Sequence, residues 1–277
     1  MNSKRSIFAL VLAGALVAMV LPASAQLTEQ VPPPRLKWSF AGPFGKYDEA
    51  QLQRGFKIYR EVCANCHSID MLSFRNLADP GGPGFSEAQA EAVAAEYKVK
   101  DIDDLGNPIE RAGRLADHFP PPFANELAAK ATHGVAPPDM STLAKAHGYQ
   151  RGFPWFVFDM ITQYQEQGPD YIAAILKGYK DPPPKGANIP SGGHYNEYFP
   201  GHAIAMPPPL QDGQVKFDDG SPETLEQYSK DVAAFLEWAA EPHLVARKRI
   251  GFQVIIFLLV LSGLLYFTKK KVWSAVH

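Results

Sequence analysis

The segment that decides the fold lies at residues 52–67 and has the sequence LQRGFKIYREVCANCH. Its first part places four apolar side chains at the spacing of one face of an α-helix: Leu52, Phe56, Tyr59 and Cys63. Its end, Cys63-Ala-Asn-Cys66-His67, matches the C-x-x-C-H pattern by which c-type haems are attached to protein. We therefore predict a helix that runs directly into a covalent haem-attachment site.

The spacing of this motif suits a single porphyrin. On a helical turn, positions i, i+3 and i+4 lie on the same face, so both thiols can reach the two vinyl groups of one porphyrin while the neighbouring imidazole lies under the iron. We expect Cys63 and Cys66 to form the two thioether bonds and His67 to be an axial iron ligand. The chain then carries one haem c.

Other uses of the cysteine pair are less consistent with its surroundings. A thioredoxin-type pair begins a helix after a strand, whereas here a predicted helix precedes Cys63. A zinc site needs further ligands at regular spacing. The sequence has no second cysteine pair, and its five histidines between residues 118 and 202 do not form an H-x3-H pattern. A disulfide across two residues closes too small a loop to stabilise a domain of this size.

The second axial ligand must come from elsewhere in the chain. We favour Met206 because Pro207-Pro208-Pro209 follow it and stiffen the loop that presents the thioether, whereas most methionines fill apolar gaps. His202 is the main rival, since two histidine ligands would give a lower potential. The remaining candidates are Met71, Met140, Met160, His118, His133, His147 and His194.

A second helix is predicted to end at Pro242. Ser221 can cap its N-terminus and Pro222 suits its first position. Apolar residues then repeat at intervals of three and four: Leu225, Tyr228, Val232, Phe235, Leu236 and Ala239. We expect this face to pack on the helix that precedes Cys63, where Gly55 allows close approach.

Residues 1–25 have the pattern of a cleavable export signal. Lys4 and Arg5 precede an apolar run at 7–21, and small residues at 23–25 form a cleavage site. An N-terminal anchor is less consistent, because the run is short and is followed by Pro22. We predict cleavage before Gln26 and a mature chain that works outside the cytoplasm.

Residues 247–271 predict a membrane anchor with basic flanks. The uncharged stretch 250–267 reaches about 27 Å as a helix, close to the roughly 30 Å hydrocarbon core. A buried core helix would not usually be bracketed by Arg247-Lys248-Arg249 and Lys269-Lys270-Lys271. With the export signal, this predicts a single-pass protein of a bacterial inner membrane. Residues 26–246 then form a periplasmic cytochrome c domain and residues 272–277 a cytoplasmic tail.

The proline content and net charge of the domain between these ends indicate its loops and its partners. Of the 25 prolines, nine form three clusters at 120–122, 182–184 and 207–209, which predicts long ordered loops. Eight of the 27 basic residues lie in the terminal segments, so 19 remain to balance 29 acidic residues. The resulting charge of −10, with acidic stretches at 101–104 and 218–219, would attract a basic soluble protein. A solvated acidic surface without a partner is equally consistent with these charges. No nucleic-acid partner is expected.

Several further segments resemble the cytochrome c1 family, the haem subunit of cytochrome bc1 complexes, in its bacterial type. The resemblance runs from about Trp38 to the C-terminus. Its residues are Arg54-Gly-Phe-Lys-Ile-Tyr-Arg-Glu-Val-Cys63, His118-Phe-Pro120, Pro137-Pro-Asp-Met-Ser141, Tyr198-Phe-Pro-Gly201, Met206-Pro-Pro-Pro-Leu210, Asp218-Asp-Gly-Ser-Pro222 and Trp238-Ala-Ala-Glu-Pro242.

This resemblance implies a mainly α fold, a cytochrome c-like haem domain with long proline-rich insertions, followed by one C-terminal transmembrane helix. It implies that His67 and Met206 are the two iron ligands and that Pro138, Leu143 and Tyr171 lie near the haem. It also implies membership of a quinol–cytochrome c oxidoreductase, a complex expected to be dimeric and surrounded by membrane lipid. Within it the chain performs electron transfer only.

The implied partners are cytochrome b, the Rieske iron–sulfur protein that donates the electron, and a soluble c-type cytochrome that accepts it. A haem subunit of a terminal oxidase or nitric oxide reductase is the alternative, although those more often keep an N-terminal anchor. A haem enzyme or sensor with an open sixth position is a third possibility, from a different functional class.

Two positions depart from the family's pattern. Where an arginine near a haem propionate is common, this chain has His147 and then Arg151, either of which could replace it. An asparagine is often found at the position of His133.

Overall fold

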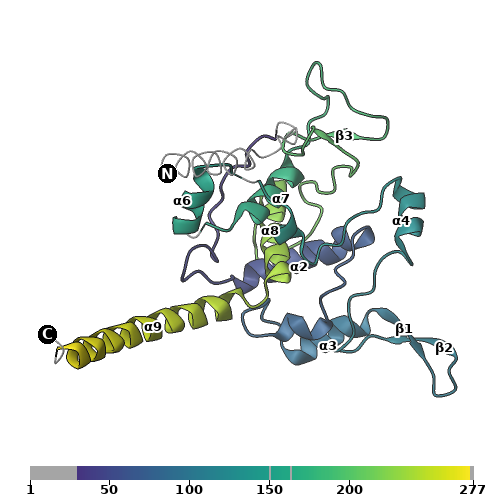
Figure 1. Cartoon of the computed structure of the whole chain (residues 1–277). Helices are drawn as coiled ribbons and strands as arrows, with labels where there is room; N and C mark the ends of the chain where they lie inside the picture. Colours follow the sequence, from purple (N-terminus) through teal and green to yellow (C-terminus); the bar gives the residue numbers. More distant parts are fainter. Residues whose placement is uncertain (1–29, 150, 163, 275–277) are drawn as a thin grey trace, which may run out of the picture.

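The computed structural model describes residues 30–149, 151–162 and 164–274, and these form a mainly helical body from which one long helix projects (Figure 1). The predicted export signal, residues 1–25, lies outside the described residues. The α-helices are α2 (Glu49–Glu61), α3 (Glu87–Ala95), α4 (Glu126–His133), α5 (Leu143–Ala146), α6 (Trp155–Thr162), α7 (Gln167–Lys177), α8 (Leu225–Ala240) and α9 (Leu244–Trp273). The mainly α fold class is confirmed.

Shorter elements connect these helices. Two 3-10 turns, η1 (Cys63–Asn65) and η2 (Phe74–Ala78), follow α2. Two antiparallel hairpins complete the set: β1 (Lys98–Ile102) pairs with β2 (Pro108–Ala112), and β3 (His194–Tyr195) pairs with β4 (Ala203–Ile204). Neither hairpin follows from the sequence patterns above, because strands this short show too few alternating positions.

The packed pair of α2 and α8 forms the centre of the core, as predicted. The ring centroid of Phe235 lies 5.7 Å from those of both Phe56 and Tyr59. Gly55 allows this approach: a Cβ there would lie 2.2 Å from the carbonyl oxygen of Asp231 and 2.6 Å from the Cβ of Phe235. The helix that leads into the haem motif is therefore fixed against α8.

The start of α8 differs from the prediction. Thr224 is the N-cap, and its hydroxyl accepts a hydrogen bond from the amide of Gln227. Ser221 instead donates to Asp219 in the preceding loop. The side chain of Glu223 accepts the amide of Phe217 and holds this loop in a non-helical path, so the helix begins only after it.

The predicted proline-rich loops are confirmed, since the clusters at 120–122, 182–184 and 207–209 all lie outside helices and strands. Proline has a rigid backbone and no amide donor, so each cluster lies where no hydrogen bond of a helix or sheet is required.

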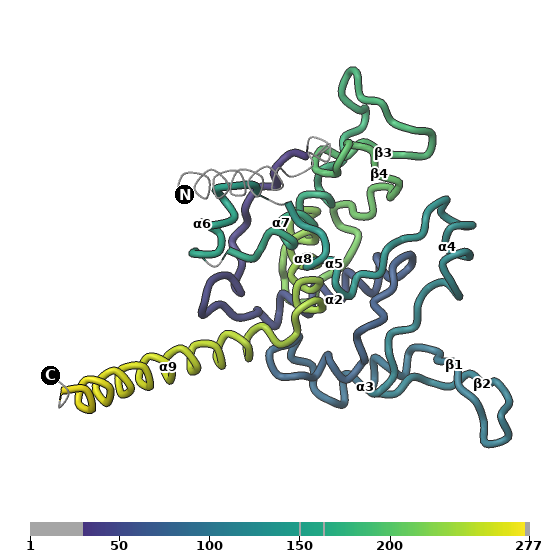
Figure 2. Tube along the Cα trace, viewed as in Figure 1, coloured from purple at the N-terminus to yellow at the C-terminus, as the bar shows by residue number. Residues whose placement is uncertain are grey.

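The long helix α9 leaves the body after a three-residue connection, Glu241 to His243 (Figure 2). Within the described part of the chain it is the one helix long and apolar enough to cross a membrane, and its most apolar 18-residue window is not buried by the body. It begins three residues before the predicted anchor. The predicted boundaries at 247 and 271 stay a prediction.

Candidate functional site

The haem motif forms a tight turn at the end of α2. The amides of Cys66 and His67 both donate to the carbonyl of Cys63, at 3.1 and 2.9 Å. The side-chain amide of Asn65 donates to the carbonyls of Glu61 and Val62, which are free at the end of the helix. The turn therefore brings both cysteines and His67 onto one short, hydrogen-bonded segment.

The imidazole of His67 is buried, and a hydrogen bond to the clamped backbone of a distant loop orients it. Its Nδ1 lies 2.8 Å from the carbonyl oxygen of Pro138. A carbonyl can only accept, so Nδ1 carries the proton and Nε2 keeps its lone pair for a metal. Burial lowers the pKa of His67 and outweighs the bond to Pro138, which favours the neutral imidazole that iron requires.

The cysteines are free thiols, and Cys63 is buried while Cys66 is half-buried. Burial raises the pKa of Cys63 to about 12, so its sulfur is an uncharged, apolar group. Across the described ranges no three His, Cys, Asp or Glu side chains are grouped as a metal site would need. A pair of free thiols beside a pre-oriented imidazole fits a c-type haem better than zinc or a disulfide.

A loop from a distant part of the chain fixes the segment after His67. Asp139 Oδ2 accepts hydrogen bonds from Ser68 Oγ at 2.8 Å and from the amide of Asp70 at 2.9 Å. The amide of Met140 donates to the carbonyl of Ser68 at 2.8 Å, and Ser141 Oγ accepts the amide of Met71 at 3.0 Å. We call residues 137–141 the clamp loop.

The clamp loop explains how Pro138 comes to face His67. The roles of Asp139 and Ser141 are not predicted by the sequence, because their partners lie about 70 residues away. The available signal was that 137–141 resembles a family segment.

The other predicted haem neighbours lie on separate elements. Met206 is half-buried in the loop after β4, and its carbonyl accepts a hydrogen bond from Tyr179 Oη at 3.1 Å. Leu143 begins α5 and packs against the core, and Tyr171 is buried on α7. No hydrogen bond or ring contact between described residues joins Met206, Leu143 or Tyr171 to His67, so their roles stay predictions.

The alternative iron ligands differ in their environments. Met71 and Met160 are exposed, Met140 is buried in the core, and the ring of His202 stacks on Tyr195 with centroids 5.6 Å apart. Arg151 forms an ion pair with Asp159 at 2.7 Å. That His147 or Arg151 replaces the family's arginine stays a prediction.

The model of the family described as "Cytochrome C1 family" matches residues 38–276, a range that holds the haem motif, the clamp loop and all of α9. The chain belongs to the cytochrome c1 family. A c-type haem follows from this membership, and the thiols and imidazole described above fit it.

Individual members of the cytochrome c1 family match over most of this chain. Cytochrome c1 of Blastochloris viridis is 50% identical over 275 residues, 98% of this chain and 96% of that relative. A protein of Bradyrhizobium diazoefficiens named cytochrome b/c1 is 59% identical over 271 residues, 97% of this chain. The chain spans only 39% of the length of that relative. A Candida albicans protein named cytochrome b-c1 complex catalytic subunit, mitochondrial, is 41% identical over 247 residues, 88% of this chain and 78% of that relative.

Replacement of Asp139 by asparagine should loosen the clamp loop of this cytochrome c1-family chain. The amide side chain would keep one acceptor but turn a donor either toward the Ser141 amide or toward Ser68 and the Asp70 amide, at an expected cost of about 2 kcal/mol. Partial burial raises the pKa of Asp139, but the hydrogen bonds from Ser141, Asp70 and Ser68 outweigh it, so the net pKa is lowered. Thermal unfolding of the detergent-solubilised holoprotein, followed by circular dichroism from pH 7 to pH 3, measures both effects.

The lowered pKa of Asp139 determines how its contribution to stability changes with pH. The contribution of Asp139 is present above about pH 4, the ordinary Asp pKa, and is lost as the pH falls through the folded-state value. The D139N variant should therefore lose less stability than the wild type over that interval. Asp218→Asn, at an exposed carboxylate, is the control. Parallel acid curves for D139N and the wild type would contradict this role.

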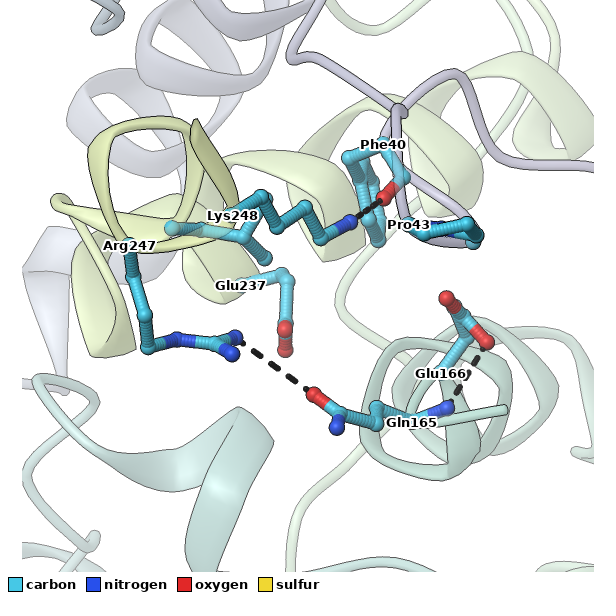
Figure 3. A pocket seen from close by; sticks show the side chains of 9 residues that line it. Phe40, Pro43, Gln165, Glu166, Glu237, Arg247 and Lys248 are labelled. Atoms are coloured by element: carbon cyan, nitrogen blue, oxygen red, sulfur yellow. Dashed lines mark hydrogen bonds between the residues drawn. The ribbon is translucent and has the colours of Figure 1, made fainter. Parts of the chain in front are cut away.

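A charged network joins the haem body of this cytochrome c1-family chain to α9. Lys145 on α5 forms ion pairs with Glu237 on α8 and with Glu241, which directly follows α8. Glu241 also pairs with Arg247 on α9. Figure 3 shows Glu237, Arg247 and Lys248 around a small pocket of about 40 Å³. Cys63, Cys66 and His67 do not line this pocket, so it is separate from the haem site.

Replacement of Lys145 by methionine should destabilise the junction between the body and α9, which these ion pairs form. Glu237 is buried and burial already raises its pKa, so loss of its cation leaves a carboxylate that must take up a proton or stay unpaired. We expect a loss of about 3 kcal/mol, the lower end for a broken buried pair, because a third of the Lys145 side chain is exposed. Thermal unfolding of the holoprotein in detergent measures it.

Two variants test that explanation. The double variant K145M/E237Q should recover most of the loss, since it removes both charges. Lys216→Met breaks an exposed pair with Glu223 and should cost less than about 1 kcal/mol. Equal losses for K145M and K216M would show that burial at the junction is unimportant.

Proposed function

We propose that this chain is the electron-transfer haem subunit of a cytochrome bc1 complex. It accepts one electron from a Rieske iron–sulfur protein and passes it to a soluble c-type cytochrome. The observation that carries this proposal is that one family match, residues 38–276, spans both the haem motif and α9. The name of the Candida albicans relative, a catalytic subunit of a cytochrome b-c1 complex, supports it.

The proposed site holds one haem c. Cys63 and Cys66 provide the thioether bonds, and His67 and Met206 are the two iron ligands, with Pro138, Leu143 and Tyr171 close by. The haem supplies one-electron redox chemistry. The chain contributes the orientation of His67 through Pro138, the burial of the imidazole, and a methionine whose thioether raises the potential.

The proposed setting is a bacterial inner membrane. Residues 1–25 are removed, the body at 26–246 lies on the periplasmic side, the anchor at 247–271 crosses the lipid bilayer, and residues 272–277 lie in the cytoplasm. Cytochrome b and the Rieske protein are proposed partners in a dimeric complex. The enzyme activity, quinol–cytochrome c oxidoreduction, then belongs to the complex as a whole.

Extraction in mild detergent tests the assignment to this complex. A tag at the C-terminus of the chain should copurify a cytochrome b and a Rieske iron–sulfur protein. The alternative, a subunit of a terminal oxidase or nitric oxide reductase, predicts a haem–copper or haem–iron core instead. Recovery of such a core without a Rieske protein would overturn the proposal.

The negative charge of the body supports a basic electron acceptor. Asp101 and Asp219 are paired with Arg111 and Arg54. Asp218 is 3.6 Å from Lys57, but its side chain is almost fully exposed. We expect the rate of electron transfer to a basic soluble cytochrome to fall as added salt shortens the Debye length from about 30 Å to about 10 Å. Stopped-flow kinetics over this salt range measure it, with an acidic soluble cytochrome as the control. A rate independent of salt would contradict electrostatic docking.

A further inference from the structure

The short helix α6 exposes apolar side chains to an unusual degree. Of its eight residues, all described, only Asp159 is buried. Phe153, just before the helix, is 82% exposed and Ile161 is 72% exposed. The other large exposed apolar side chains of this segment are Trp155, Phe156, Val157, Phe158 and Met160. A patch of this kind on a protein surface marks contact with an apolar environment.

The orientation of α6 is fixed by its one acidic residue. Asp159 Oδ1 lies 2.7 Å from Arg151 Nη1 and 3.2 Å from Arg35 Nη2, and Oδ2 accepts a hydrogen bond from Gln167 Nε2 at 3.3 Å. These contacts turn the polar group of the helix toward the body. A surface helix in water buries its apolar side and exposes its polar side. Helix α6 does the opposite, since it buries Asp159 and exposes its apolar side chains.

The position of α6 places this apolar surface near the start of α9. Figures 1 and 2 show α6 on the side of the body toward which α9 runs. The segment that follows α6 reaches α9 directly, since Gln165 Oε1 lies 3.5 Å from Arg247 Nη2 (Figure 3). Arg247 is the first residue of the basic cluster that precedes the uncharged stretch of α9.

Another exposed aromatic residue of the body lies against the apolar part of α9. The ring of Phe44 is 71% exposed and meets the ring of Phe252 edge-on, with centroids 5.4 Å apart. Phe252 belongs to the uncharged stretch of α9. An exposed aromatic group of the body thus contacts the helix that is proposed to enter the membrane.

We propose that α6 lies in the interfacial layer of the membrane, with its aromatic side chains among the phospholipid acyl chains. Trp and Phe side chains are typical of this layer, and the guanidinium of Arg151, 4.8 Å from the Trp155 ring, is suited to the headgroup region. This inference rests on the proposed function in one respect, that α9 crosses the bilayer. Contact at both α6 and α9 holds the body at a set tilt, which the short connection at 241–243 alone does not ensure.

Nitroxide spin labels in the complete, membrane-reconstituted complex test this contact. Phe158→Cys places a label on α6, and Ile161→Cys provides a second position if the first variant does not fold. Leu259→Cys on α9 and Leu105→Cys on the exposed hairpin tip are the lipid and water controls. Labelled complexes in phosphatidylcholine–phosphatidylglycerol vesicles, with the haem reduced and the signal of the unsubstituted complex subtracted, are examined by power-saturation spectroscopy.

The expected result is that dissolved oxygen, which concentrates in lipid, relaxes the labels at 158 and 161 several-fold more than a water-soluble nickel chelate does. The label at 105 should show the reverse. If the α6 labels resemble the label at 105, α6 lies in water and the inference is wrong. If they are shielded from both reagents, a protein surface covers α6 and the inference is also wrong. A water-like label at 259 would instead overturn the proposed membrane span, and the inference with it.

Discussion

Met206→Leu is expected to lower the midpoint potential of the haem by a sizeable part of the roughly 0.8 V range that axial ligands span. A thioether ligand favours ferrous iron, and leucine offers no lone pair to replace it. The reduced variant should also bind carbon monoxide readily, which the wild type should not. Redox titration of the absorption spectrum, with and without carbon monoxide, measures both effects.

Met140→Leu is the matched control, because it makes the same change at a methionine buried in the core. Its potential should stay near that of the wild type. An unchanged potential in M206L would remove Met206 from the iron and direct the same experiment to His202. Carbon monoxide binding by the reduced wild type would favour a haem enzyme or sensor with an open sixth position.

Gly55→Ala is expected to destabilise the body strongly and to reduce the yield of protein with attached haem. The added Cβ would lie 2.2 Å from the backbone oxygen of Asp231, and backbone cannot move aside as a flexible side chain can. Overpacking costs up to about 3 kcal/mol, against which alanine regains about 1 kcal/mol of helix propensity. The net loss of about 2 kcal/mol corresponds to a melting temperature about 4–8 °C lower.

Gly251→Ala controls for the change in helix propensity, since Gly251 is also helical and a Cβ there meets nothing within 4 Å. Thermal unfolding of both variants and their haem absorbance per polypeptide distinguish a packing effect from a propensity effect. A G55A variant as stable as G251A would show that α2 and α8 can separate without penalty.

The sequence alone was sufficient to predict features that depend on residues close together in the chain or on the periodicity of one helix. Two thiols and an imidazole within five residues suit one porphyrin through the pitch of a helical turn. The membrane-compatible helix follows from an uncharged stretch between basic clusters. Contact between α2 and α8 was predictable because both helices carry an apolar face, and a glycine stands where they cross.

The capping residues in the sequence did not correctly predict where α8 begins. Ser221 and Pro222 suit a helix start, yet Thr224 caps α8 because the hydrogen bond from Phe217 to Glu223 holds the preceding residues in a loop. Short-range capping preference is worth only about 1 kcal/mol, so a longer-range contact can override it.

The tertiary structure alone decided the features that join distant residues. His67 and Pro138 are 71 residues apart, and only the folded chain shows that this carbonyl orients the imidazole. The same holds for Asp139 and for the ion pair with Arg35 that binds Asp159 to the body and turns α6 outward. Local sequence thus determined which cofactor the chain can bind and which helix can enter a membrane. The orientation of those groups depended on hydrogen bonds and packing between segments whose separation in sequence leaves no local periodic signal.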